Sequence, residues 1–137
     1  MPSIRIPCPI VHHRTFGDIF YPGLKVDVRL ADGRYQAFEF ILDSGADCTM
    51  VPRYMANLVG FQLPSQPNES VSGISNEVMP AFAGEMQLQI QTEQFGIRCL
   101  YMESNRVPFL LGRLDFFSLY NVQFNGRDCC IILTKLN

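Results

Sequence analysis

The stretch that decides the fold is Phe38-Glu39-Phe40-Ile41-Leu42-Asp43-Ser44-Gly45-Ala46-Asp47-Cys48-Thr49-Met50-Val51-Pro52. An apolar run leads directly into Asp43-Ser44-Gly45, and apolar and β-branched residues resume after Asp47. A carboxylate at the end of such a strand needs an explanation, because burying a charge without a partner costs several kcal/mol. Two explanations are open at this point: a polar turn, for which Asp, Ser and Gly are ordinary residues, or a catalytic carboxylate on a tight loop.

Regular patterns on either side of this stretch predict β-strands. Alternating apolar residues over 24–30 have the period of a half-buried strand, and Asp32-Gly33 predicts a turn that reverses the chain. Residues 35–42 then form the return strand, which ends at Asp43. Beyond the Asp-Ser-Gly turn, residues 48–51 predict a further short strand.

The rest of the chain carries patterns of the same kind. Residues 52–58, with Gly60 just beyond, predict a short helix with a glycine stop. Small and polar residues around Gly73 predict the exposed tip of a hairpin. Further strands are expected over residues 85–91, 95–102, 107–111, 121–124 and 128–133, with one or two turns of helix after Gly112. Together these patterns predict an all-β chain with one or two short helices.

Residues 1–23 differ in character from the rest. They include four prolines and show no sustained period, so we expect an extended N-terminal segment, followed by a single domain over residues 24–137. His12-His13 lie in this segment without other metal ligands at suitable spacing, and we interpret them as surface histidines. No metal site and no cofactor are therefore expected.

Composition narrows the possible function classes. The chain has 137 residues and a net charge of −2 with no basic cluster, which gives no support for nucleic acid as a partner. No apolar run has the length of a membrane span, and the N-terminus lacks the apolar stretch of a secretory signal, so we expect a cytoplasmic protein without membrane contacts. Five cysteines without a Cys-x-x-Cys pair fit reduced thiols. An apolar fraction of 47% against 18% charged residues favours a self-association surface.

The two halves of the chain carry related motifs. Phe40-Ile41-Leu42-Asp43-Ser44-Gly45 is followed by a short helix, and Phe109-Leu110-Leu111-Gly112 is followed by another. With this pair the chain resembles the retroviral-type aspartic proteases (retropepsins), whose monomers have one Asp-Thr/Ser-Gly-Ala motif and a later apolar-apolar-Gly motif. Gly45-Ala46-Asp47 and Gly112-Arg113 match the family's Gly-Ala-Asp and Gly-Arg. The resemblance covers roughly residues 24–133 and implies a retropepsin-like closed β-barrel, the acid-protease fold.

The resemblance implies roles for the residues of the first motif. Asp43 would be the general base and general acid, Ser44 would hydrogen-bond across a two-fold axis, and Gly45 would allow close approach of the backbone to substrate. Asp47 would contact the substrate backbone while Arg113 holds it in a bidentate pair, and a purely structural ion pair is the open alternative. Serine stands where retroviral enzymes more often have threonine, and its hydroxyl can make the same bond.

Outside this motif the resemblance implies a flap and side-chain pockets. Gly73 and Ile74 lie where the family has a glycine-bearing flap that folds over substrate. Pro108 and Leu110 would line apolar pockets for substrate side chains, by their position relative to the family motifs. Leu110 is also expected to be a core residue, as apolar strand positions usually are.

The single Asp-Ser-Gly motif sets the expected assembly. Peptide hydrolysis without a metal or covalent intermediate needs an activated water and an acid, and two adjacent carboxylates that share one proton supply both. The second carboxylate would come from another copy, so we expect a homodimer that acts as an aspartic endopeptidase on extended polypeptides. Two alternatives stay open: a non-catalytic dimerisation or peptide-binding module with this fold, and a hydrolase that depends on Cys48.

Overall fold

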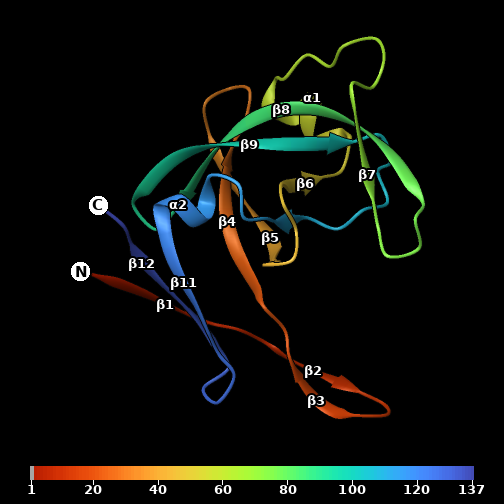
Figure 1. The fold of residues 1–137 in the computed structure, drawn as a ribbon. Helices are drawn as coiled ribbons and strands as arrows, with labels where there is room; N and C mark the ends of the chain where they lie inside the picture. The colour runs from red at the N-terminus through yellow and green to blue at the C-terminus, as the bar shows by residue number, and fades with distance from the viewer. Residues whose placement is uncertain (1) are drawn as a thin grey trace.

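The structure, a computed structural model, describes residues 2–137, which form twelve strands and two short helices (Figure 1). Met1, the first residue of the expected N-terminal segment, lies outside the described residues. The strands are β1 (Ser3–Pro7), β2 (Ile10–His13), β3 (Gly17–Phe20), β4 (Gly23–Arg29), β5 (Tyr35–Leu42), β6 (Thr49–Val51), β7 (Glu69–Ser72), β8 (Val78–Ile90), β9 (Glu93–Met102), β10 (Leu110–Leu111), β11 (Tyr120–Asn125) and β12 (Cys130–Lys135). The helices are α1 (Tyr54–Val59) and α2 (Phe116–Leu119). No helix in the described part of the chain is long and apolar enough to cross a membrane.

A closed barrel forms the body of the molecule. Seven strands are hydrogen-bonded in the order β4-β5-β10-β6-β9-β8-β7, and an additional pairing of β4 with β8 closes the first six into a barrel. β7 pairs only with the N-terminal end of β8 and so lies outside the closed barrel (Figure 1). The expected all-β fold with a closed barrel and short helices is confirmed.

The alternation in the sequence explains which faces line the core. Leu24, Val26 and Val28 of β4 are buried while Lys25 and Arg29 are exposed, as the period-two pattern predicted. The side chains that alternate in β8 behave in the same way. Because successive side chains in a strand point to opposite faces, each barrel strand fills the interior with every second residue.

Helix α1 follows the expected plan with a small shift of its bounds. It spans Tyr54–Val59 and ends at Gly60, whose φ of 78° is left-handed and therefore suits glycine. The Gly60 N–H donates to the Asn57 carbonyl at 3.3 Å, which closes the last turn. The buried side chains of Met55 and Ala56 attach the helix to the barrel.

Strand β10 is shorter than expected and lies at the centre of the topology. The apolar run over 107–111 yields only Leu110–Leu111, which pairs in parallel with β5 through Ile41 and antiparallel with β6 through Met50. The Phe109 ring stacks on Phe38 at 5.4 Å. This placement brings the second apolar-apolar-Gly motif beside the end of β5, where the Asp-Ser-Gly turn begins.

The two ends of the chain form a second sheet. β1 pairs antiparallel with β12, and β12 pairs with β11, in the order β1-β12-β11. β2 and β3 follow β1 and form a separate two-stranded hairpin that extends away from the barrel (Figure 1). The N-terminal segment expected to be extended thus contains three strands before β4 begins at Gly23.

Candidate active site

Asp43 lies at the point where β5 leaves the barrel. The Leu42 N–H donates to the Pro22 carbonyl at 2.8 Å, and the Asp43 N–H donates to the Leu111 carbonyl at 3.0 Å. The chain is therefore held on both sides as it enters the turn. The Asp43 Oδ1 accepts the Gly45 N–H at 2.9 Å, which orients the carboxylate within the turn.

A close backbone approach joins the two motifs. The Gly112 N–H donates to Thr49 Oγ1 at 3.1 Å, and an added Cβ at Gly112 would lie 2.4 Å from the carbonyl carbon of Cys48. Only glycine fits this contact, because real Cβ atoms do not approach backbone so closely. Thr49 is fully buried, and no site role was predicted for it from the sequence. The one feature of the sequence that could have indicated a role for Thr49 is its hydroxyl group, which stands in an otherwise apolar strand.

Arg113 ties the turn to the loop that follows β10. Its Nη2 lies 2.5 Å from Asp47 Oδ1, and its Nη1 donates to the Ser44 carbonyl at 2.6 Å. Arg113 therefore holds Asp47 through one nitrogen and not in the expected bidentate pair, because its second nitrogen is taken by the backbone of the turn. Two backbone bonds run alongside, from Arg113 N–H to the Ala46 carbonyl at 3.0 Å and from Leu114 N–H to the Asp47 carbonyl at 2.8 Å. The Asp47 carboxylate remains largely exposed despite this pairing, with 87% of its side-chain surface accessible. It is thus held in place and still able to meet a ligand.

A cleft of about 1110 Å³ opens above this turn. Its lining includes Asp43, Gly45 and Asp47 from the turn and Gly73 and Ile74 from the tip of the β7–β8 hairpin. Most of the remaining lining comes from β6, β7, β8 and β9, and Leu114 adds a residue from the loop after β10. The structure therefore brings the Asp-Ser-Gly turn and the expected flap residues to one cavity, large enough for several residues of an extended peptide.

Four of the expected site residues, Ser44, Pro108, Leu110 and Arg113, lie outside the lining of the cleft in the single chain. Ser44 is exposed at the turn, and Pro108 is exposed before β10. Leu110 is half-buried in β10, and its cross-strand partner Met50 lines the cleft instead. Ile74, by contrast, is in the lining although its side chain is fully exposed at the hairpin tip.

An ion pair at the wall of the cleft was not expected from the sequence. Arg98 lines the cleft and holds Asp115 with two side-chain bonds, Nη2 to Oδ1 at 2.8 Å and Nε to Oδ2 at 3.0 Å. The backbone N–H of Arg98 also donates to Asp115 Oδ2, at 2.8 Å. These hydrogen bonds lower the pKa of the Asp115 carboxyl below its ordinary value. No local pattern links the two residues, because β9 and the start of α2 meet only in the folded chain.

Cys48 lies in the cleft but lacks the surroundings of an activated nucleophile. Burial raises the pKa of its thiol, and the negative charge of Asp47 raises it further, so the thiolate is disfavoured. His12 bonds to Asp18 across its own hairpin at 3.0 Å, and the His13 ring accepts the Thr15 N–H at 3.0 Å. Both rings are therefore engaged within the β2–β3 hairpin. Among residues 2–137, no group of three His, Cys, Asp or Glu side chains is arranged as a set of metal ligands.

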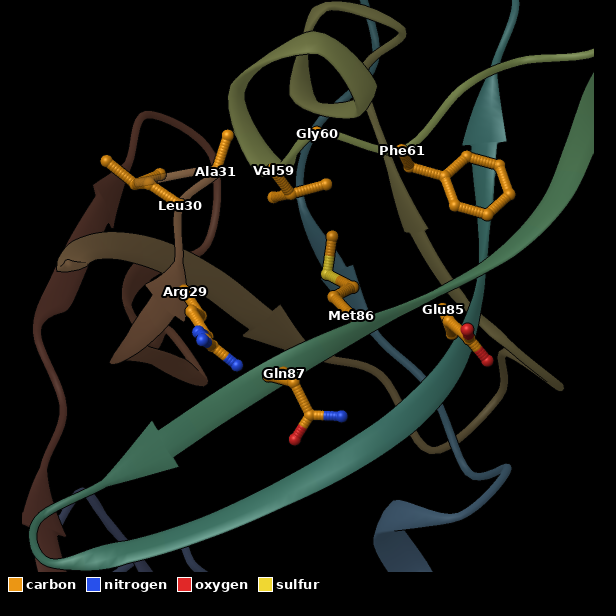
Figure 2. Close-up of a pocket in the computed structure, with 9 residues that line it drawn as sticks. All are labelled: Arg29, Leu30, Ala31, Val59, Gly60, Phe61, Glu85, Met86 and Gln87. Atoms are coloured by element: carbon orange, nitrogen blue, oxygen red, sulfur yellow. The ribbon is translucent and has the colours of Figure 1, made fainter. Parts of the chain in front are cut away.

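A second, smaller hollow lies between α1, the β4–β5 turn and β8 (Figure 2). Its volume is about 280 Å³, a quarter of that of the Asp43 cleft. Figure 2 shows the Met86 side chain extending toward Val59 across it, with Arg29 and Glu85 at its margin. A single carboxylate beside an apolar floor offers no acid–base pair, so the Asp43 cleft is the better candidate for chemistry.

Comparison with known proteins finds similarity among solved structures. No protein-family model matches the sequence, and no curated protein shows significant similarity to it. Among solved structures, the EIAV protease in complex with an inhibitor is 16% identical, with a TM-score of 0.51, over 75% of this chain and 88% of that chain. A retropepsin-like aspartic protease from Rickettsia conorii is 17% identical, with a TM-score of 0.59, over 96% of this chain and 89% of that chain. The chain therefore has a retropepsin-like fold, as the sequence motifs predicted.

Proposed function

We propose that this retropepsin-like chain is an aspartic endopeptidase, which hydrolyses peptide bonds of extended polypeptides with a dyad of two Asp43 carboxylates at the two-fold axis of a homodimer. One observation carries the proposal. Asp43 stands on a turn that is hydrogen-bonded on both sides and opens into a cleft of about 1110 Å³. A turn with a purely structural role has no need of an ionisable group directed into a cavity of this size.

The chemistry of the dyad explains why two chains are needed. A water molecule must lose a proton while the carbonyl oxygen of the peptide gains one, and both partners must lie within hydrogen-bond reach. Two neighbouring carboxylates cannot both stay ionised, so they share one proton and divide the two tasks. Each chain supplies one Asp-Ser-Gly turn. The partner Asp43 therefore has to come from a second copy.

The other residues of the turn have supporting roles in this proposal. The exposed Ser44 hydroxyl hydrogen-bonds across the two-fold axis and keeps the two turns in register. Gly45, without a side chain, leaves room for the substrate backbone beside Asp43. Asp47 accepts a hydrogen bond from the substrate backbone while Arg113 restrains its carboxylate, as the short Arg113 contact supports.

The β7–β8 hairpin acts as the flap. Its tip carries Gly73 and the fully exposed apolar side chain of Ile74, and both residues line the cleft. Closure of this tip over a peptide would cover Ile74 and exclude water, and the strand edge would add backbone hydrogen bonds. Pro108 and Leu110 complete apolar side-chain pockets together with the second copy.

Cleavage of an unfolded protein tests the proposal directly. The Asp43→Asn variant should lose at least about a thousandfold in kcat/KM, because neutral asparagine can act as neither base nor acid. The matched control is Asp32→Asn, which makes the same change in the exposed β4–β5 turn and should keep full activity. A statine-type transition-state mimic should inhibit the wild type, and thiol alkylation should leave it active.

Each negative result has a distinct meaning. Equal activity of wild type and Asp43→Asn would remove Asp43 from the mechanism. Inactivity of the wild type over the whole pH range, together with binding of extended peptides, would favour the non-catalytic peptide-binding module. Loss of activity on alkylation would favour the hydrolase that depends on Cys48.

A further inference from the structure

The two faces of the β2–β3 hairpin differ chemically toward its tip. Val11 and Ile19 are direct cross-strand partners, so their side chains share one face, and 47% and 43% of their surfaces are exposed. Phe16 at the hairpin tip is 78% exposed and stacks on the His13 ring at 5.0 Å. Since His13 is two residues from Val11, it belongs to the same side. Val11, His13, Phe16 and Ile19 make up what we call the apolar arm face.

The opposite face carries Ile10 and Phe20 at the base of the hairpin, where Ile10 is 55% exposed, and polar residues toward the tip. His12 and Asp18 are cross-strand partners there, with the ring nitrogen 3.0 Å from the carboxylate oxygen. Beyond the Ile10–Phe20 pair at the base, the apolar side chains of the hairpin lie on the apolar arm face and the charged pair lies on the other. In the single chain the apolar arm face is nevertheless exposed. A two-stranded hairpin alone is marginal in water, so one that exposes this much apolar surface is expected to pack against another surface.

The hairpin starts directly beside the candidate catalytic residue. Its base is closed by a hydrogen bond from Tyr21 N–H to the Pro9 carbonyl at 3.0 Å, and the next residue, Pro22, accepts the Leu42 N–H at 2.8 Å. β4 runs antiparallel to β5, and Gly23 at the start of β4 pairs with Ile41 near the end of β5. The chain that precedes Gly23 therefore lies at the end of β5 that leads to Asp43. Figure 1 shows the hairpin extending beyond the barrel on this side.

We infer that the β2–β3 hairpin is a dimer arm, whose apolar face packs on a second copy of this chain. The inference rests on the proposed function, because a two-fold axis at Asp43 places the second barrel immediately beyond the point where the hairpin leaves the first. Four residues of strand extend about 13 Å, enough to reach across such an axis. The symmetry buries two arms per dimer, so each apolar side chain contributes twice.

A double substitution on the apolar arm face tests this contact. Val11→Thr with Ile19→Thr keeps two β-branched residues in the strands; it replaces a methyl group of Val11 and the ethyl group of Ile19 by a hydroxyl. The dissociation constant of the dimer, measured by sedimentation over a range of concentrations, should rise at least about tenfold, because four apolar contacts per dimer are weakened. The matched control, His12→Thr with Asp18→Thr, changes the polar face of the same hairpin and should stay within about twofold of wild type.

Hydrogen exchange of the wild type gives a second readout that does not depend on a variant folding. The amides of β2 and β3 should exchange more slowly at concentrations above the dissociation constant than below it. A wild-type dissociation constant in the Val11/Ile19 variant, unchanged exchange of the hairpin amides on dimerisation, or a wild type that stays monomeric at every concentration would each overturn the inference.

The tests separate this inference from the proposed function. A dimer weakened by Val11→Thr with Ile19→Thr supports the arm even if Asp43→Asn cleaves as well as wild type. Conversely, cleavage that depends on Asp43 together with a dimer insensitive to the arm substitutions overturns only the arm. In that case the hairpin face binds a different protein or none.

Discussion

Gly112 is the residue through which the two halves of the chain meet. A side chain at this position would collide with the Cys48 carbonyl carbon and oxygen, both 2.4 Å from its Cβ. The colliding atoms are backbone in a held turn, so they cannot move aside as a flexible side chain could. The contact also lets the Gly112 N–H reach the buried hydroxyl of Thr49. One missing Cβ thus determines the distance between Arg113 and the Asp43 turn.

Gly112→Ala should therefore destabilise the protein by about 3 kcal/mol, since the backbone of the turn must shift to accept a methyl group. Denaturation by urea measures this as a lower midpoint with an unchanged slope. Gly126→Ala is the matched control. An added Cβ there meets nothing within 4 Å, and its free energy of unfolding should stay within about 1 kcal/mol of wild type. Similar losses in both variants would contradict this account of Gly112.

At the scale of elements, β9 and α2 are joined by the pair of Arg98 and Asp115. Asp115 precedes α2 with a φ of 69° and a ψ of −43°, a γ-turn conformation closed by a hydrogen bond from the Phe116 N–H to the Leu114 carbonyl at 2.8 Å. In this conformation its carboxylate reaches both the backbone and the guanidinium of Arg98. The wall of the cleft is therefore tied to the loop that follows Arg113.

The contribution of this pair should depend on pH. The pKa of Asp115 is lowered in the folded chain, chiefly by the side-chain bond from Arg98, so its stabilisation is present above the unfolded pKa of about 3.9 and is lost as the pH falls through the folded pKa. Asp115→Asn retains tolerance of positive φ and should cost about 0.5–1 kcal/mol at pH 7, given that Arg98 is largely exposed. Urea unfolding at pH 7, 5 and 3 should show this difference shrinking only below about pH 4. An equal difference at all three pH values would contradict it.

At the scale of the whole molecule, one chain carries half of the proposed dyad. Activity should rise more steeply than in proportion to protein concentration below the dimer dissociation constant, and in proportion above it. Mixing wild type with an excess of Asp43→Asn subunits should suppress cleavage, because heterodimers have one carboxylate in place of two. Asp32→Asn subunits are the control, and they should leave activity undiminished. Activity that is proportional to concentration throughout and insensitive to Asp43→Asn subunits would exclude a shared site.

Much of the barrel could be predicted from the sequence, because the patterns that indicate its strands and turns involve residues close together in the chain. β5 spans Tyr35–Leu42 as expected, and the turn around Gly73 does join β7 and β8. Alternation and turn residues act over a few positions and specify strands and hairpins wherever they occur. β10 was overestimated for the same reason, since an apolar run does not say how many of its residues find hydrogen-bonding partners on both sides.

The sequence by itself determined most of the barrel strands and the tight turn at Asp43, because these follow from steric and hydrogen-bonding preferences of neighbouring residues. Only the tertiary structure decided which distant residues meet. The pairing of β1 with β12, the bond from Gly112 to Thr49 and the pair of Arg98 with Asp115 all join segments far apart in the chain. Such contacts depend on how the barrel closes and on the register of its strands, and no local pattern encodes them.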